Sequence, residues 1–312
     1  MAQGSQSQQT LRIISANIQH GKPAALSEKT PRGLIKHMRS WLKHRRQYRQ
    51  ALEETGRLFD SLDADIVCLQ EVDTRTLRVF LSDQTEIVAR AMKRRYTCRG
   101  LFYHSLSHAI RLRPWYALYP TPPIIGGYGV SIISRYPVAA WQWLPLGAAP
   151  VRFIPTGGKG FAGTRTKIAL GQTRGMISAA VMIGNQILRI GSTHLELHKP
   201  TALHQLRHCV NQMEDTADIA WILCGDMNLE ADDISQLLRT NVVDRGGYGG
   251  NMSQNAYWDV TELTIPAHAP RRTLDHVIAP HNMVPLNVQT VRMPVSDHRA
   301  LVVDMEVSTS AS

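Results

Sequence analysis

Cysteine is scarce in this chain: only four of the 312 residues are cysteine, and no two of them form a Cys-x-x-Cys pair. A disulfide framework and a cysteine-based zinc site are therefore not expected. The chain also lacks an apolar run of about 18 residues, which excludes a membrane-spanning helix. Its polar first nine residues lack the basic start and apolar stretch of a secretory signal peptide, so the expected location is cytoplasmic. Segment 157–164 is rich in glycine but lacks the Gly-Lys-Ser/Thr ending of a phosphate-binding loop, which argues against a nucleoside triphosphatase.

Acidic residues are outnumbered by basic ones. The chain has 35 Lys and Arg against 25 Asp and Glu, a net charge of +10. Such an excess favours anionic partners. It does not distinguish DNA or RNA from an anionic membrane surface or a phosphorylated metabolite.

Apolar runs and helical periodicity alternate along the chain, and 43% of its residues are hydrophobic. Strands are predicted over about 11–16, 65–69, 128–135, 177–183, 187–193, 221–224, 273–279 and 299–306. Helices are predicted over about 31–62 (one long helix or two in tandem), 83–94, 200–217 and 232–238, with long loops at 96–127 and 145–175. Strands outnumber helices and often follow one another directly, so two packed sheets flanked by helices are expected.

The first predicted helix has Thr30-Pro31 as its expected start and a basic face. That face carries Lys36, Arg39, Lys43, Arg46 and Arg49. We interpret it as a solvated face, with phosphate contact as the alternative.

Polar clusters fall where the predicted strands stop. They are Asn17, Gln70-Glu71, Thr193-His194, Asp226 with Asn228, Asp275, and Ser296-Asp297-His298. Any one of these residues alone is explained as a turn former. Together they supply oxygen ligands, imidazoles and acids that orient them, and oxygen ligands suit Mg²⁺ or Mn²⁺ better than zinc.

Seven blocks of the sequence resemble, in order, the motifs of the endonuclease/exonuclease/phosphatase superfamily. They are Ser15-Ala16-Asn17, Leu69-Gln70-Glu71, Tyr128-Gly129-Val130-Ser131-Ile132-Ile133-Ser134-Arg135-Tyr136-Pro137, Ser192-Thr193-His194-Leu195, Gly225-Asp226-Met227-Asn228, Leu274-Asp275-His276-Val277 and Ser296-Asp297-His298. The resemblance implies a four-layered α/β sandwich with two central, mostly antiparallel sheets flanked by helices. It also implies one catalytic domain over 11–306, with a disordered tail at 1–10 and a second tail at 307–312.

The resemblance implies that this domain is a metal-dependent hydrolase of phosphoester bonds, with Mg²⁺, or Mn²⁺ in its place. Glu71 matches the metal-binding glutamate of the superfamily. Asn17 and Asp297 match residues that help to hold the ion, which offsets the charge that builds on a phosphate oxygen during attack.

Five further positions match catalytic residues of the superfamily. His298 matches the histidine that either deprotonates water or stabilises the pentacovalent phosphorus, and Asp275 matches the acid that orients it. Asp226 matches a residue that orients or activates water, and Asn228 matches a hydrogen-bond donor to the phosphoryl group. His194 matches a histidine that acts as a general acid or as a phosphate donor, and which histidine is acid or base stays open.

Arg174 resembles part of an arginine-glycine pair of the bacterial branch, with phosphate binding or a structural salt bridge as its role. The substrate is a phosphodiester or a phosphomonoester. The positive charge favours a nuclease, since phosphate neutralisation drives binding to DNA or RNA. A phospholipid or small organophosphate substrate is the alternative, followed by a noncatalytic anion-binding protein. The oligomeric state is left open.

Overall fold

Two six-stranded sheets lie face to face in the computed structural model, which describes residues 7–27, 34–76, 79–104, 126–160, 163–169, 171–215, 219–244 and 257–309. The strands of the first sheet are β1 (Ser7–Asn17), β2 (Ile66–Thr74), β3 (Tyr96–His104), β4 (Gly127–Ser134), β13 (Val284–Arg292) and β14 (Arg299–Thr309). Those of the second are β5 (Val138–Gly147), β8 (Arg174–Ile183), β9 (Gln186–His194), β10 (Trp221–Asp226), β11 (Tyr257–Thr261) and β12 (Asp275–Pro280).

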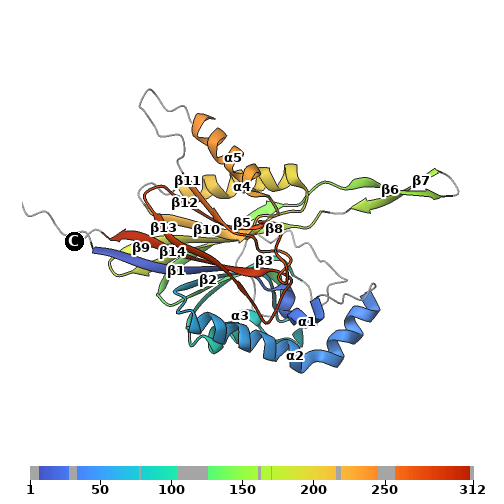
Figure 1. Cartoon of the computed structure of the whole chain (residues 1–312), viewed down its shortest axis with the longest axis horizontal. Helices are drawn as coiled ribbons and strands as arrows, with labels where there is room; N and C mark the ends of the chain where they lie inside the picture. The colour runs from blue at the N-terminus through green and yellow to red at the C-terminus, as the bar shows by residue number, and fades with distance from the viewer. Residues whose placement is uncertain are drawn as a thin grey trace, which may run out of the picture.

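Helices cover the outer face of each sheet. α2 (Leu34–Ser61) and α3 (Gln84–Ala91) lie on the first sheet, and α4 (Lys199–Glu214) and α5 (Ala231–Asp244) lie on the second (Figure 1). Two short helices, η1 (Gln19–Gly21) and α1 (Ala24–Ser27), follow β1. The four layers confirm the predicted sandwich, and no helix in the described ranges is long and apolar enough to span a membrane.

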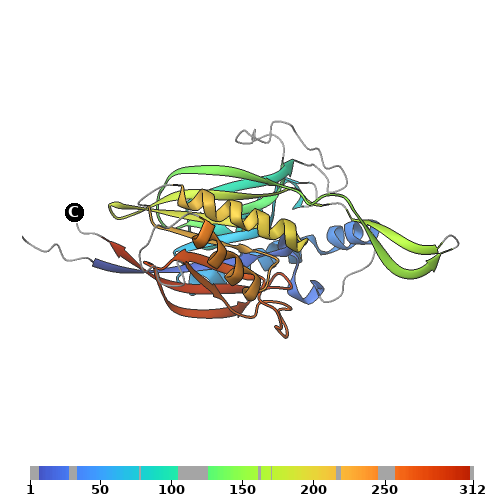
Figure 2. The ribbon, with the colours of Figure 1, turned by 90° about the horizontal axis from the view of Figure 1, so that it is seen from above.

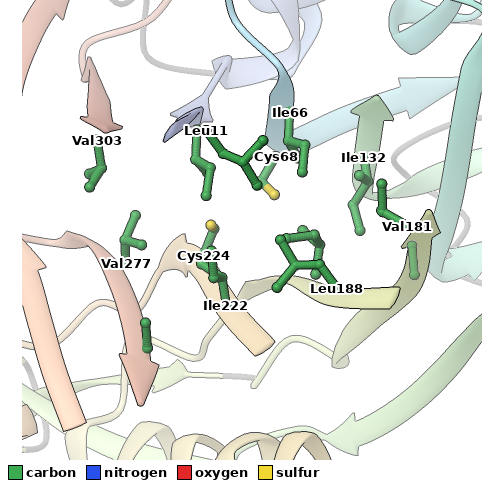
Figure 3. Close-up of a cluster of buried hydrophobic side chains, with 14 of the residues drawn as sticks. Leu11, Ile66, Cys68, Ile132, Val181, Leu188, Ile222, Cys224, Val277 and Val303 are labelled. Atoms are coloured by element: carbon green, nitrogen blue, oxygen red, sulfur yellow. The ribbon is translucent and has the colours of Figure 1, made fainter. Parts of the chain in front are cut away.

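Alternation of side chains along the central strands builds the core. In β1, Leu11 and Ile13 face the other sheet, whereas Ile14 and Ala16 face α2 and α3. Strands β2 and β10 behave in the same way, which explains why their sequences are continuously apolar. Figure 3 shows side chains of the two sheets, among them Cys68 and Cys224, pointing toward one another between the layers. Both thiols are free and buried, as expected of cysteines in apolar runs.

Each sheet has one parallel pair at its centre. The strand order is β13-β14-β1-β2-β4-β3 in the first sheet and β11-β12-β10-β9-β8-β5 in the second. Only β1 with β2 and β9 with β10 run parallel, so both sheets are mostly antiparallel, as predicted. The carboxyl ends of four central strands therefore meet at the same end of the sandwich.

Two of the predicted loops are wrong in part. Segment 96–104 of the first is strand β3, and 105–125 lies outside the described residues. Much of 145–175 forms β6 (Arg152–Gly160) and β7 (Gly163–Ala169), an antiparallel hairpin that projects beyond the sandwich (Figures 1 and 2). Glycine-rich strands without apolar alternation give no strand signal in the sequence, which explains this error.

The remaining boundaries differ by small amounts. β1 begins at Ser7 and β14 ends at Thr309, because the outer ends of the two strands pair with each other, with Ser7 opposite Thr309. Both strands therefore extend beyond the predicted domain limits of 11 and 306. α2 is kinked at His44, where φ is −108° and ψ is 15°. It is thus one long helix made of two helical segments, which agrees with both predicted alternatives, a single helix and two in tandem. Its expected start at Thr30-Pro31, like the side chains of Lys36, Arg39 and Lys43, lies outside the described residues.

Candidate active site

Three predicted site residues form one row across three neighbouring strands. Asp226, the last residue of β10, is the register partner of His194 at the end of β9 and of Asp275 at the start of β12. Asn17, at the end of β1 in the other sheet, donates a hydrogen bond from Nδ2 to Asp226 Oδ2 at 2.9 Å. Two sheets thus deliver buried polar groups to one point.

Asp226 is the centre of this cluster. Besides Asn17, its Oδ2 faces His194 Nε2 at 3.6 Å and His298 Nε2 at 3.9 Å, and its Oδ1 accepts the Asn228 backbone N–H at 3.1 Å. Burial raises the pKa of Asp226 to about 6, with His298 and Asn17 opposing the rise. A carboxylate with a pKa close to neutral is suited to accept a proton during turnover.

His298 is held between two carboxylates. It is the last residue of the loop before β14, and its Nδ1 lies 2.8 Å from Asp275 Oδ2, while its Nε2 points toward Asp226. Burial lowers the pKa of His298, but the charge of Asp275, its hydrogen bond and the charge of Asp226 together raise it to about 10. His298 is therefore an imidazolium in this arrangement, which favours stabilisation of negative charge over deprotonation of water.

His194 is held in the opposite state. Arg174, which is 3% exposed, places Nη1 at 3.2 Å from His194 Nδ1. A guanidinium only donates, so Nδ1 accepts and the proton of the neutral ring lies on Nε2. Burial and then the charge of Arg174 hold the pKa of His194 well below its usual value. Arg174 pairs with no carboxylate within the described part of the chain and instead fixes the tautomer of His194. Phosphate binding by Arg174 stays a prediction.

Glu71 sits at a β-bulge and not at a strand end. β2 continues to Thr74, and the register with β4 shifts between Leu69 and Val72. The φ of Glu71 is 55°, a left-handed conformation that is uncommon for a side-chain-bearing residue. Bulges next to active sites aim a side chain, and this one separates Glu71 from the ladder.

His20 is a site residue that the sequence analysis missed. It lies in η1, three residues after Asn17, and its Nε2 is 3.3 Å from Glu71 Oε2, with Nδ1 3.5 Å from Asp73 Oδ2. Its ring also packs against Tyr128 at 5.0 Å between centroids. Its place directly after a polar strand end was the only available signal.

The remaining predicted residues lie around this centre. Asp297 is near Lys22, whose pKa is lowered by burial and partly restored by the charge of Asp297. Asn228 donates one side-chain N–H to the carbonyl of Leu195 at 3.0 Å. The predicted hydrogen bond to the phosphoryl group would use the second hydrogen of the same amide.

The acids of the cluster fit a divalent cation that prefers oxygen. Carboxylate oxygens of Asp226 and Asp275 lie within 4.8 Å of one another and of a ring nitrogen of His298, which cannot coordinate an ion while it is an imidazolium. Asp275 Oδ1 is buried and has no hydrogen-bond partner within the described part of the chain. Carboxylate oxygens are the ligands that Mg²⁺ and Mn²⁺ prefer. The set predicted from the sequence, Asn17, Glu71 and Asp297, stays a prediction.

His276 stabilises the wall of this site without facing it. The ring is fully buried, with Nδ1 at 2.8 Å from Asp259 Oδ1 and Nε2 at 3.0 Å from the Leu229 carbonyl and 3.2 Å from that of Thr273. Both nitrogens face acceptors, so both carry protons. Burial lowers the pKa of His276, but the charge of Asp259, the hydrogen bonds to Asp259 and Leu229 and the charge of Asp275 together raise the pKa above its usual value. The imidazolium ties β12 to β11 and to the loop after Asn228.

Replacing His276 with leucine is expected to lower the free energy of unfolding by about 3–5 kcal/mol, because the buried Asp259 carboxylate loses its partner. Urea denaturation followed by circular dichroism measures this. The double variant Asp259→Leu/His276→Leu is the control, and it should be less destabilised than His276→Leu. A loss below about 1 kcal/mol in the single variant would contradict a buried ion pair.

Comparison with known proteins places the chain in a family. The fold is a four-layered α/β sandwich with buried acids and histidines at one end of its central strands. The model of the Endonuclease/Exonuclease/phosphatase family matches residues 14–298. The chain belongs to that family, as its motifs predicted. A search of curated proteins found no match.

Solved structures agree in fold. An endonuclease/exonuclease/phosphatase from Bacteroides vulgatus has a TM-score of 0.60 and 12% identity, covering 96% of this chain and 100% of that one. One from Beutenbergia cavernae has a TM-score of 0.58 and 17% identity, covering 96% and 72%. A mannosyl-6-phosphatase from Bacteroides thetaiotaomicron has a TM-score of 0.57 and 12% identity, covering 95% and 99%. At these identities the likeness shows the fold alone.

Proposed function

We propose that this protein is a phosphoric ester hydrolase that uses a divalent cation, Mg²⁺ or Mn²⁺, and attack of water at phosphorus. The oxygen of water forms a bond to phosphorus, the ester P–O bond breaks, and the leaving oxygen takes a proton from solvent. The observation that carries the proposal is the buried group of Asp226, Asp275 and His298, joined to Asn17 of the other sheet. Family membership agrees with it.

Asp226 is proposed to accept the proton of the attacking water. Burial raises its pKa to about 6, which leaves the carboxylate ionised at neutral pH and still basic enough to take a proton. His298, held as an imidazolium by Asp275, stabilises the negative charge that grows on the phosphoryl oxygens. The sequence left His298 either to deprotonate water or to stabilise the pentacovalent phosphorus, and these assignments favour the stabilising role.

His194 and Asn228 are proposed to donate hydrogen bonds to the phosphoryl group. Arg174 keeps the proton of His194 on Nε2, which faces the cluster. The neutral ring is a donor and not a strong acid, since its pKa lies well below its usual value. Glu71, aimed by the bulge, would hold the cation with Asn17, Asp297 or the acids of the cluster. When bound, the cation supplies positive charge next to the reacting phosphate.

Metal dependence is the first test. Protein stripped with EDTA and dialysed is expected to release nitrophenol from bis(4-nitrophenyl) phosphate or 4-nitrophenyl phosphate about 100-fold faster once Mg²⁺ or Mn²⁺ is restored, equivalent to about 3 kcal/mol of transition-state stabilisation. Using both esters separates a diesterase from a monoesterase. His298→Gln protein, purified in parallel, excludes a contaminating phosphatase. Absence of metal-dependent release across a broad phosphoester panel would instead support a noncatalytic anion-binding protein.

A further inference from the structure

A basic groove lies between the middle of α2 and the loop that leads to α3. Its cavity has a volume of about 410 Å³, within the range of small-ligand sites, and its lining includes Arg45, Arg46, Tyr48, Arg49, Phe80 and Gln84. The three arginines are exposed, and Phe80 is half-buried. Only Arg46 and Arg49 were part of the basic face read from the sequence, so the groove itself required the tertiary structure.

The groove combines positive charge with flat groups. The guanidinium of Arg45 lies over the Phe80 ring at 4.6 Å from its centroid. Arg49 pairs with Glu53 at 2.9 Å, whereas Arg46 has no carboxylate partner within the described part of the chain. Guanidinium groups bind phosphate oxygens through two donors, and their faces stack on nucleobases. Such a surface suits a ligand that alternates phosphates with aromatic bases.

The groove adjoins the active site through direct contacts. Gln84 donates from Nε2 to the carbonyl of His20 at 2.7 Å and accepts the backbone N–H of Asp73 at 2.8 Å. His20 in turn contacts Glu71. A Cβ on Gly21 would lie 2.8 Å from Leu52 Cδ1, so α2 packs directly on the turn after β1. The groove and the active site therefore share the turn after β1 as a common wall.

We propose that this groove is a subsite for a phosphate that is not cleaved, in a single strand of nucleic acid whose scissile phosphate lies at Asp226 and His298. The proposal rests on the proposed function and names its substrate class. Single strands are bound by basic grooves that track the backbone together with flat groups on which bases stack, and this groove offers both.

Binding of a fluorescein-labelled ten-nucleotide DNA strand to full-length protein in EDTA tests the subsite. The variant Arg45→Gln/Arg46→Gln is expected to raise Kd at least tenfold at 50 mM NaCl. Loss of the one phosphate held by this subsite should also lower the slope of log K against log salt by about 0.7, the contribution of one neutralised phosphate on a single strand. Arg207→Gln/Arg239→Gln is the matched control, since it removes the same charge from exposed positions of α4 and α5 on the opposite face, and it should change Kd less than twofold (Figure 1).

Equal effects of the two double variants would overturn the subsite. The nucleic-acid assignment would be overturned if inorganic phosphate, inositol hexakisphosphate or vesicles with a phosphoinositide bound more tightly than the oligonucleotide and with the same dependence on Arg45 and Arg46.

A cleavage assay separates failure of this inference from failure of the proposed function. The preference of the wild type for the oligonucleotide over bis(4-nitrophenyl) phosphate should fall at least tenfold in Arg45→Gln/Arg46→Gln, and a retained preference would overturn the subsite. If the wild type hydrolyses neither of these diesters nor 4-nitrophenyl phosphate, the proposed function fails, and the binding comparison still decides whether the groove takes a nucleic acid strand.

Discussion

Replacing His298 with glutamine is expected to lower kcat for phosphodiester hydrolysis by about 10³-fold. Glutamine keeps a polar side chain next to Asp275 but carries no charge. The wild-type imidazolium, fixed by a 2.8 Å contact with Asp275, has a pKa of about 10, raised by the two carboxylates against burial. Loss of one preorganised donor at a developing negative charge costs about 10²–10³ in rate, and here the positive charge is lost as well. Steady-state kinetics with saturating Mg²⁺ measures the change.

The exposed His204 on α4 provides the control, and His204→Gln should keep wild-type kcat. A His298→Gln enzyme that retains more than a tenth of wild-type kcat would contradict the role assigned to His298. Thermal unfolding shows whether the variant is folded, so a lost activity is not mistaken for a lost fold.

The raised pKa of His298 also predicts that the stability of the folded protein depends on pH. In metal-free protein the folded state binds a proton at His298 more tightly than the unfolded state, whose pKa is about 6.5. This contribution is complete below pH 6.5 and is lost as pH rises toward 10. The Tm of the wild type should therefore fall more steeply between pH 7 and 10 than that of His298→Gln, and parallel curves would contradict the raised pKa.

Asp226→Asn is expected to lower kcat by about 10³-fold while leaving the Tm at pH 8 no lower than that of the wild type. Asparagine has nearly the same shape but cannot accept the proton of water, and a general base contributes about 10²–10⁴ in rate. Loss of activity without loss of stability distinguishes a catalytic group from a structural one.

The expected Tm of Asp226→Asn follows from the raised pKa of Asp226. Because burial lifts the pKa from 3.8 to about 6, the ionised carboxylate is less favourable in the folded state. The cost develops as pH rises from 3.8 to 6 and is complete above 6, so asparagine removes it at pH 8. Asp232→Asn on the exposed face of α5 is the matched control and should keep full activity. A large fall in Tm for Asp226→Asn, or kcat within tenfold of the wild type, would contradict this assignment.

Several strands and helices could be predicted because their signals are local. The apolar runs at 66–69 and 221–224 are buried on both faces, and the periodicity of α2 matches the face it packs on the first sheet. Strand β13 is exposed along much of its length and does not bury one regular face, so it carries no such pattern. The glycine-rich hairpin of β6 and β7 also lacks apolar alternation in its sequence. Each of these strands is paired with the strand next to it in the chain, β6 with β7 and β13 with β14.

The sequence by itself determined the layered architecture and the residue types of the site. Apolar runs that form buried strands, and the polar residues next to them, are both recognised from residues that are close together in the chain. It did not determine the contacts that give these residues their chemistry. Asn17 and Asp226 are 209 residues apart, and their hydrogen bond exists because two sheets stack with their central strands aligned. The tautomer of His194, the charge of His298 and the contact of His20 with Glu71 likewise depend on which side chains the packing brings together. Proton affinity is set by burial and nearby charge, and both are properties of the tertiary structure.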